Sequence, residues 1–541
     1  MKFKHVKKLG ALFLAATMLT AVLTGCGNNQ KAADNTTQGA AESSAAEGTQ
    51  ASGENQAVVN SKDVVELKVV TMGTPPTSGL DAFYEAMDAL TVPDLGVKIR
   101  LQHVSWGEEG TKIPLAITGG EADLICCGPW ANFDDYAAKN AFADMTPYIS
   151  EMPELIEFFE TNMGEGYVEK MKTNGKLFGL TQLSDGVGGD GFLYRQDLQE
   201  EWGLAPVTDF NSAEAYLYAA KENGYNYSIA DSRLVLFLWE MTAGNKYVQV
   251  SGSGDFNGLT YLVAPIDDPY HAVSVFETEE FRKCCEIAEK WYADGIVKSD
   301  VLAGRAGDAE VLFAQDVTCV EACNHLAVAQ STIAPKVLGD NPEWKLNFAS
   351  YYFFNNGTPI FKPTTNTTRI TISSQSKYPE LAMKFIEKAY TDETYSKLLQ
   401  YGVEGVNYVD QDGVAVVENA DEKFPCVTGF SNFVFSYGKS FSNDEWKANY
   451  EASYNKIFEA MQSGNQYNPY DGFTFDSTAV TSQFANMENV KAEYGTPLTC
   501  GVIQSSLDKD LEVFRKAMEQ AGAREYVAEF QRQLDEFAAG K

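Results

Sequence analysis

Several large aromatic residues of this chain stand beside side chains that can form hydrogen bonds. Trp130 lies two residues before Asn132, Trp106 is followed closely by two glutamates, and Trp239 directly precedes Glu240. An exposed ring can stack on the apolar face of a ligand while a neighbouring amide or carboxylate binds its polar groups, so this pattern is typical of noncovalent binding. Core packing is the alternative at each position, because aromatic residues more often serve cores.

Three further residues complete the set of candidate ligand-binding residues. Gln182 and Asp185 adjoin the glycine-rich segment 185–191, where they could reach hydroxyl groups of a ligand or serve only in a turn. Tyr352 belongs to the aromatic run Tyr351–Phe354, which two asparagines follow. The alternation in this run suits a strand with one exposed side, so we expect half of it to be core.

Motifs for catalysis, phosphate binding and metal binding are not completed. The segment 185–191 contains no G-x-x-x-x-G-K-[ST] phosphate loop, and we interpret it as a hinge or interdomain crossover. The chain has no G-x-S-x-G motif for a nucleophile and no C-x-x-C or H-x-x-x-H spacing for zinc. Asp410–Gly413 lacks the remaining ligands of a calcium loop and predicts a β-turn. We therefore predict no cofactor and no metal site.

The N-terminus has the layout of a secretory signal. Lysines precede the apolar segment Leu9–Leu23, and the residues up to Cys26 read Leu-Thr-Gly-Cys. This cysteine resembles that of the bacterial lipobox, which implies a signal peptide over residues 1–25 and diacylation of Cys26 at the outer face of the cell membrane. An ordinary signal peptide with a chance cysteine is the alternative. Residues 26–62 contain no aromatic ring and predict a flexible tether.

The 541-residue chain is strongly acidic, with a formal net charge of −33, and 44% of its residues are hydrophobic. Its length and apolar content are sufficient for two or more folded domains. A polyanion would be repelled by this charge, so we predict no nucleic-acid partner. Besides Cys26 there are eight cysteines, which could form disulfides outside the cell or remain free and buried.

Strands and helices alternate at the start of the ordered region. Residues 64–70, 97–104 and 122–127 are predicted strands, and helical stretches separate them. This order predicts a parallel sheet with crossover helices, in which ligands gather at the carboxyl ends of the strands. Trp106 and Trp130 stand just beyond two of those ends.

The second half of the chain contains amphipathic helices. One apolar face runs from Leu381 to Ala389, and Thr391 is predicted to cap the helix that follows. Two more helices close the chain, with Gly522 between them. Their apolar faces are Leu507, Leu511, Phe514 and Met518 in the first and Val527, Phe530, Leu534 and Phe537 in the second.

Five motifs occur in a fixed order along the chain after the lipobox and tether. They are Asp123-Leu124-Ile125 with Trp130, Gly175–Leu180, Leu193–Leu198, Trp291–Ile296 and Ser374–Ala382. Together they resemble the family 1 extracellular solute-binding proteins of bacterial ABC importers. The stretches 399–408 and 528–537 resemble the larger lipoprotein branch found in Firmicutes, and the resemblance covers nearly all of the chain from about Val64.

The resemblance implies an α/β chain with a two-lobed periplasmic-binding-protein fold, type II-like, with a ligand cleft between the lobes and extra C-terminal helices. Lobe 1 would comprise residues 63–185 with a return segment of about 370–410. Lobe 2 would comprise residues 186–369, completed by about 411–541. Hinge closure would trap a small solute, which is then delivered to the transmembrane subunits of a permease.

Many members of this family bind oligosaccharides, whereas others bind different solutes. Sugars offer hydroxyls for polar side chains and C–H faces for aromatic rings, and Trp130 and Trp106 fit this requirement. We therefore expect a non-enzymatic, lipid-anchored binding protein for an oligosaccharide. One alternative is a surface-anchored glycoside hydrolase, which would need two carboxylates about 5–9.5 Å apart. Another is a binding protein for peptides or other small solutes.

Overall fold

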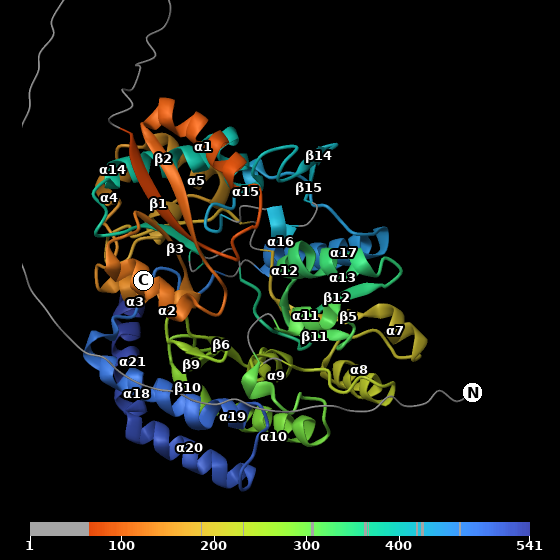
Figure 1. Ribbon diagram of the computed structural model, residues 1–541. Helices are drawn as coiled ribbons and strands as arrows, with labels where there is room; N and C mark the ends of the chain where they lie inside the picture. The colour runs from red at the N-terminus through yellow and green to blue at the C-terminus, as the bar shows by residue number, and fades with distance from the viewer. Residues whose placement is uncertain are drawn as a thin grey trace, which may run out of the picture. The chain divides into compact units, whose positions relative to one another are not determined.

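The computed structural model describes residues 64–184, 187–230, 232–304, 308–361, 365, 367–417, 420–423, 427–464 and 467–540. These residues belong to one compact unit (Figure 1). The predicted signal peptide, Cys26, the predicted tether and Asp185 lie outside the described residues.

A five-stranded sheet organises the first part of the chain. Its strand order is β2 (Val97–Val104), β1 (Val65–Met72), β3 (Leu124–Cys127), β13 (Arg369–Ile372) and β4 (Leu180–Thr181). β1 pairs in parallel with β2 and β3, which confirms the predicted parallel arrangement. β13 is antiparallel to both of its neighbours. The chain therefore leaves through β4 and returns through β13 at the same edge where the parallel strands end.

Helices cover both faces of this sheet because β1 has apolar side chains on both sides. Leu67 and Val69 pack with Phe83 of α1 (Leu80–Leu95), whereas Val70 packs with Ile113 of α2 (Glu109–Gly119). Successive side chains of a strand point to opposite faces, so one strand serves two cores. The face of Phe83 is also covered by α5 (Pro153–Met163), α14 (Pro379–Thr391) and α15 (Glu393–Tyr401).

A second sheet contains β11 (Val320–His325), β5 (Asp190–Arg195) and β12 (Leu346–Ser350), with both outer strands antiparallel to β5. Its helices include α8 (Phe210–Glu222), α9 (Leu234–Ala243), α10 (Glu279–Ala293) and α17 (Asp444–Gly464). α17 lies along β12, where the Asn449 and Ser453 side chains donate to the backbone carbonyls of Leu346 and Phe348 at 2.8 and 3.0 Å. These bonds satisfy carbonyls on the outer edge of β12.

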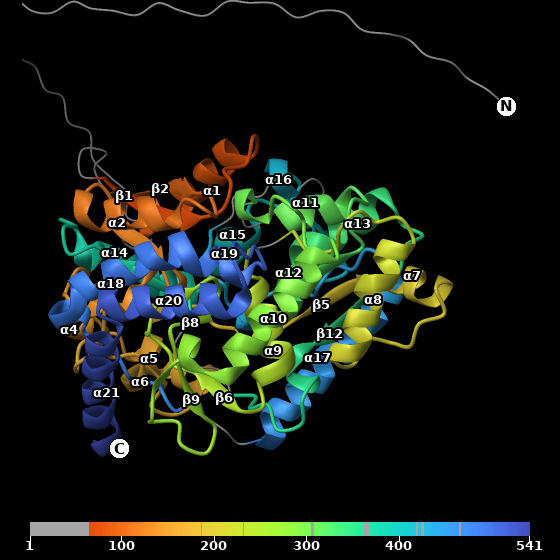
Figure 2. The same cartoon turned by 90° about the horizontal axis from the view of Figure 1, so that it is seen from below.

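The C-terminal helices pack beside a small sheet of β10 (Val273–Ser274), β9 (Leu262–Pro265) and β6 (Tyr247–Gln249) (Figure 2). They are α18 (Thr481–Val490), α20 (Leu507–Ala521) and α21 (Ala523–Ala539). Their predicted apolar faces point inward, since Phe514 and Phe530 are fully buried and Val527 and Phe537 partly so. Gly522 joins α20 to α21 with a φ of 98°, a conformation that favours glycine.

The hydrophobic clusters divide the described chain into two lobes. Lobe 1 is the five-stranded sheet with its helices, and lobe 2 comprises the two three-stranded sheets with the helices that pack on them. The chain passes between the two sets of clusters three times: between Leu183 and Val187, between Phe361 and Ile370, and between Phe430 and Phe441.

The return segment in lobe 1 is longer than the predicted range of about 370–410. Val427 and Phe430 still pack in the lobe 1 core, and the backbone N–H of Leu183 donates to Ser431 at 2.9 Å. The hairpin of β14 (Val409–Gln411) and β15 (Val414–Val416) contains no buried residue. The hairpin therefore gives no sign, through burial in a core, that the chain continues in lobe 1.

The glycine-rich segment 185–191 lies at the first crossing. Its glycines at 186, 188 and 191 have the G-x-G-x-x-G spacing of a dinucleotide fingerprint, which requires a helix directly after the glycines. The strand β5 follows instead, so we retain the interpretation of this segment as a hinge.

Candidate functional site

Two tryptophans lie together at the edge of lobe 1 where β2 and β3 end. Trp106 follows β2 and is 54% exposed, whereas Trp130 is half-buried in the 3₁₀ turn η1 (Pro129–Ala131) after β3. Their rings meet edge to face with centroids 5.1 Å apart. Trp130 holds Trp106 at the sheet edge, and the exposed part of the Trp106 ring is a surface on which a ligand can stack.

The two segments that connect β4 and β13 to lobe 2 lie beside Trp130. The indole Nε1 of Trp130 donates to the Thr368 hydroxyl at 3.2 Å, and the backbone N–H of Gln182 donates to the Thr368 carbonyl at 3.1 Å. Gln182 and Trp130, which were both predicted, are thus brought together by Thr368, which sequence reasoning missed. No sequence motif marks Thr368, because its position depends on the antiparallel pairing of β13.

Asn132 has a backbone role in addition to its predicted ligand-binding role. Its φ of 56° is left-handed, its N–H donates to Pro129, and its carbonyl accepts from Tyr136. Asparagine tolerates this conformation better than most residues. The side chain is exposed next to the Trp130 turn.

Lobe 2 has polar residues at the end of its sheet where β5 begins and where β11 and β12 end. Asp190 opens β5 and pairs in register with His325, whose Nε2 lies 3.6 Å from Asp190 Oδ1. The end of β12 leads into the turn η5 (Tyr351–Phe353), which places the ring of Tyr352 against Gly189. Gly189 has a φ of 112° and leaves no room for a Cβ beside that ring, so this approach requires glycine.

Glu240 belongs to the same group of residues. Its Oε1 accepts a hydrogen bond of 2.8 Å from Gln249 Nε2. Burial raises the pKa of Glu240 to about 7, and the negative charge of Asp190 acts in the same direction. Burial also raises the pKa of Tyr352, with Glu240 and Asp190 adding to the effect. We call Asp190, Glu240, Gln249 and Tyr352 the Glu240 cluster; near neutral pH its central carboxyl can either donate or accept a hydrogen bond.

The structure places Trp239 in the core of lobe 2, so its predicted ligand-binding role stays a prediction. This residue is 1% exposed, and its ring packs against Tyr247 with centroids 5.5 Å apart. α9 buries most of its residues, so a ring on it offers no face to a ligand. The neighbouring residue Glu240 is the better sequence signal for a polar site, because it is the one charged residue in the largely apolar sequence of α9.

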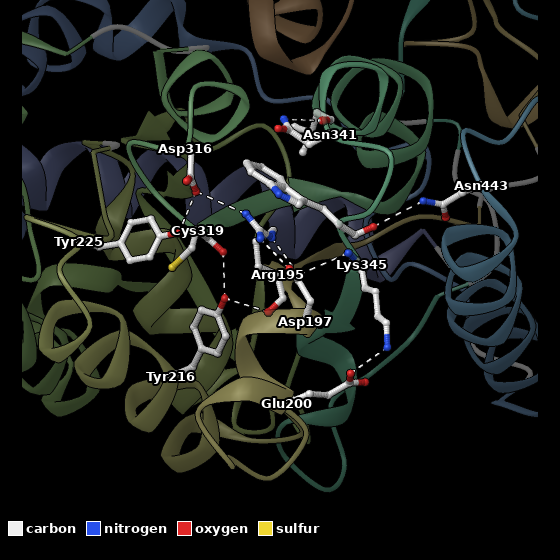
Figure 3. Close-up of polar contacts among 12 residues, drawn as sticks. Arg195, Asp197, Glu200, Tyr216, Tyr225, Asp316, Cys319, Asn341, Lys345 and Asn443 are labelled. Atoms are coloured by element: carbon white, nitrogen blue, oxygen red, sulfur yellow. Dashed lines mark hydrogen bonds and ion pairs between the residues drawn. The ribbon is translucent and has the colours of Figure 1, made fainter.

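A second polar cluster lies at the opposite end of β5 (Figure 3). Arg195 is 5% exposed, donates to the two carboxylate oxygens of Asp197 at 2.8 and 2.6 Å, and lies 3.3 Å from Asp316 Oδ1. Its guanidinium stacks on Trp344 at 3.4 Å from the ring centroid. The Tyr216 hydroxyl donates to the Arg195 carbonyl at 3.0 Å. These contacts join β5 to α8 and to the segment before β11, so we interpret the cluster as structural.

Six of the described cysteines are buried thiols outside disulfide bonds: Cys126, Cys127, Cys284, Cys285, Cys319 and Cys500. Burial raises the pKa of the Cys127, Cys284 and Cys319 thiols to about 12. These side chains are therefore uncharged packing residues at neutral pH.

No group of three or more His, Cys, Asp or Glu residues in the described ranges could hold a metal ion. Asp410–Gly413 forms the turn of the β14–β15 hairpin, in which the Gly413 N–H donates to Asp410 Oδ1 at 2.8 Å, and this confirms the predicted β-turn. In the part of the chain that the structure describes, none of the helices is both long and apolar enough to cross a membrane.

Comparison with known proteins shows which families the chain resembles. Residues 76–280 match the family described as bacterial extracellular solute-binding protein, and residues 469–539 match a domain of unknown function. Over residues 76–280 the chain is similar to the bacterial extracellular solute-binding proteins. A carbohydrate ABC transporter substrate-binding protein of Streptococcus pneumoniae serotype 4 is 22% identical over 512 residues, which cover 90% of this chain and 94% of that protein.

Solved structures share the fold. The N-glycan transport solute-binding protein NgtS of Streptococcus pneumoniae, in complex with Man1GlcNAc, has a TM-score of 0.67 at 21% identity and covers 87% of this chain and 99% of its own. A binding protein for HMO from Bifidobacterium longum infantis has a TM-score of 0.56 at 17% identity, with 87% and 98% covered. The alginate-binding protein AlgQ2 has a TM-score of 0.61 at 16% identity, with the same coverage.

Proposed function

We propose that this protein is the substrate-binding protein of a bacterial ABC importer, which captures an oligosaccharide between its lobes and delivers it to the permease. The observation that carries the proposal is the Trp106–Trp130 pair at the ends of parallel strands, beside the connecting segments that contain Gln182 and Thr368. Ligands of open α/β sheets bind at this edge. The family match and the carbohydrate and glycan names of the relatives support the proposal.

Binding combines stacking with hydrogen bonding. Trp106 stacks on the C–H face of a sugar ring, and Gln182 binds hydroxyls from the lobe 1 side. Asp190, Glu240 and Tyr352 bind hydroxyls from the lobe 2 side. Because the two groups belong to different lobes, the ligand contacts both only when the lobes approach, and it therefore stabilises the closed arrangement. No bond of the ligand is broken in this mechanism.

We also infer that Cys26 carries the lipid that anchors the protein at the extracellular face of the cell membrane. The signal layout of residues 1–25 and the extracellular nature of the family support this inference. Metabolic labelling with palmitate tests it, since a Cys26→Ala variant should lose the label and appear in the medium. Equal labelling of the variant would contradict it.

A thermal-shift screen of the purified protein against a panel of oligosaccharides tests the main proposal. A ligand present at 100 times its Kd and bound only by the folded state adds about 2.7 kcal/mol of stability. We expect a clear shift with one glycan class and recovery of that glycan intact. Cleavage of the glycan would indicate a hydrolase, and a shift only with peptides or other solutes would overturn the ligand class.

A further inference from the structure

The segment 467–480 contains the start of the domain of unknown function and is fixed in the lobe 2 core. Phe473 and Phe475 both pack on Phe530 of α21, with ring centroids 5.3 and 4.5 Å apart. The Tyr470 hydroxyl donates to the carbonyl of Pro269 at 2.6 Å. Three aromatic anchors within six residues hold this segment in lobe 2.

Between and beyond these anchors, polar side chains of the same segment contact lobe 1. The hydroxyls of Thr474 and Thr173 lie 3.2 Å apart. The Ser477 hydroxyl donates to the carboxylate of Asp135 and accepts a bond of 3.3 Å from Lys139 Nζ. Lys139 also pairs with Asp135 at 2.8 Å, which fixes both partners of Ser477 on α3 (Phe133–Ala138) and its C-cap.

Beneath these contacts lies Arg369, the first residue of β13 after the second crossing between lobes. Its guanidinium donates to the carbonyls of Met171 at 3.0 Å and Thr365 at 2.8 Å and stacks over Phe133 at 4.3 Å. Arg369 is 5% exposed, and it interacts electrostatically with Asp134 of lobe 1 and with Asp471 of the segment.

A water-sized cavity of about 10 Å³ adjoins this arginine. Residues of both lobes line it, among them Asp134 and Thr173 from lobe 1 and Tyr470 and Thr474 from the segment. Among the described residues, no hydrogen-bond partner is found for the buried Nε of Arg369. A buried N–H that has no hydrogen-bond partner costs free energy. The cavity has about the volume of one water molecule, and a water there would accept the Arg369 Nε–H.

We propose that residues 467–480 form a strap that fastens lobe 2 to lobe 1 beside the hinge, so that the lobes pivot about the Thr474–Thr173 and Ser477–Asp135 contacts. The inference deepens the proposed function, on whose lobe closure it rests. The strap gives the lobes a noncovalent connection next to the covalent crossing at Thr365–Arg369. Polar contacts near a pivot move little during rotation, and they can restrict the opening of the unliganded protein without preventing closure.

Hydrogen exchange of the unliganded protein tests the strap without any sugar. In a Thr474→Val, Ser477→Ala double variant we expect amide exchange in residues 167–176 and 467–480 to accelerate at least threefold, with an unchanged circular dichroism spectrum. Ser482→Ala is the matched control, because that hydroxyl bonds only to the adjacent Gln483 among the described contacts. Exchange in 167–176 equal to that of the control would overturn the proposal.

A second variant changes the lobe 1 partner in the same contact. Asp135→Asn removes the charge that binds both Ser477 and Lys139, and we expect it to accelerate exchange in 467–480 by a similar factor. Acceleration confined to the neighbourhood of Asp135 would show that the contact does not couple the lobes. The hydrogen-exchange measurements use no sugar, so their outcome does not depend on the oligosaccharide screen. The strap and the proposed ligand class can therefore be rejected independently of each other.

Discussion

The indole rings of Trp106 and Trp130 meet edge to face, with their centroids 5.1 Å apart. They come from loops after two different strands, and their meeting follows from the parallel pairing of β1 with β2 and β3. The exposed ring is thereby supported by a half-buried one, which is itself bonded to Thr368. A rigid aromatic surface binds with a smaller loss of conformational entropy than a mobile one.

Trp106→Ala should weaken sugar binding without unfolding the protein. Loss of a stacked ring costs about 1.4 kcal/mol, which corresponds to roughly a tenfold rise in Kd measured by isothermal titration calorimetry. Tyr378→Ala is the matched control, since Tyr378 is a lobe 1 aromatic with 40% exposure. An equal Kd for Trp106→Ala and the control would show that Trp106 does not belong to the binding site.

Trp239→Ala should behave in the opposite way. Removal of a fully buried tryptophan leaves a cavity and costs about 3–5 kcal/mol of stability, which urea unfolding will measure. The folded fraction of Trp239→Ala should bind ligand with the same Kd as the wild type. A large loss of affinity with unchanged stability would restore Trp239 to the ligand site.

Glu240 should make stability depend on pH. Its pKa is raised from 4.5 to about 7 in the folded chain, so the folded state holds this proton more tightly than the unfolded state does. The resulting stabilisation is complete at low pH and is lost as the pH rises through about 7, by at most about 3 kcal/mol. Glu240→Gln removes this dependence.

The measurement for Glu240 is the melting temperature at pH 5 and pH 8. We expect the wild type to lose more stability than Glu240→Gln between these values. Glu459→Gln is the control, because Glu459 is exposed. Parallel pH profiles for the wild type and Glu240→Gln would contradict the assigned environment of this carboxyl.

Arg195→Met should destabilise lobe 2 by about 1.5–3 kcal/mol, because it removes the charged hydrogen bonds to Asp197. Arg524→Met is the control, since that side chain is 80% exposed and its pair with Glu519 is worth about 0–1 kcal/mol. Chemical denaturation compares the two. Equal midpoints would mean that the Arg195 cluster contributes little to stability.

Local patterns predicted the local structure well. The strand and helix order before Cys127 and the apolar faces of α20 and α21 follow from periodicity, which reports burial directly. The predicted cap of α15 was one residue away: Asp392, and not Thr391, accepts from the backbone N–H of Thr394 at 2.8 Å. Both residues are good caps by type, and the choice between them depends on where the preceding helix stops.

The candidate site was predicted only in part, because its residues meet through tertiary pairing. Trp106, Trp130 and Gln182 are marked by strand ends and the glycine-rich segment, whereas Thr368 and Gln249 have no local mark. The burial of Trp239 could not be predicted, because sequence adjacency to Glu240 does not tell which of two neighbouring helical residues faces outward. Asp185 stays a prediction.

The antiparallel course of β13 has an evolutionary consequence. Gln182 and Thr368 lie both in the joint between the lobes and in the wall beside Trp130. Under the proposed function, a change at either position would alter two equilibria together, the opening of the protein and its contact with the solute. Under that proposal, such a chain could acquire a new solute preference by adjusting how far it opens, while the aromatic rings of the proposed site stay the same.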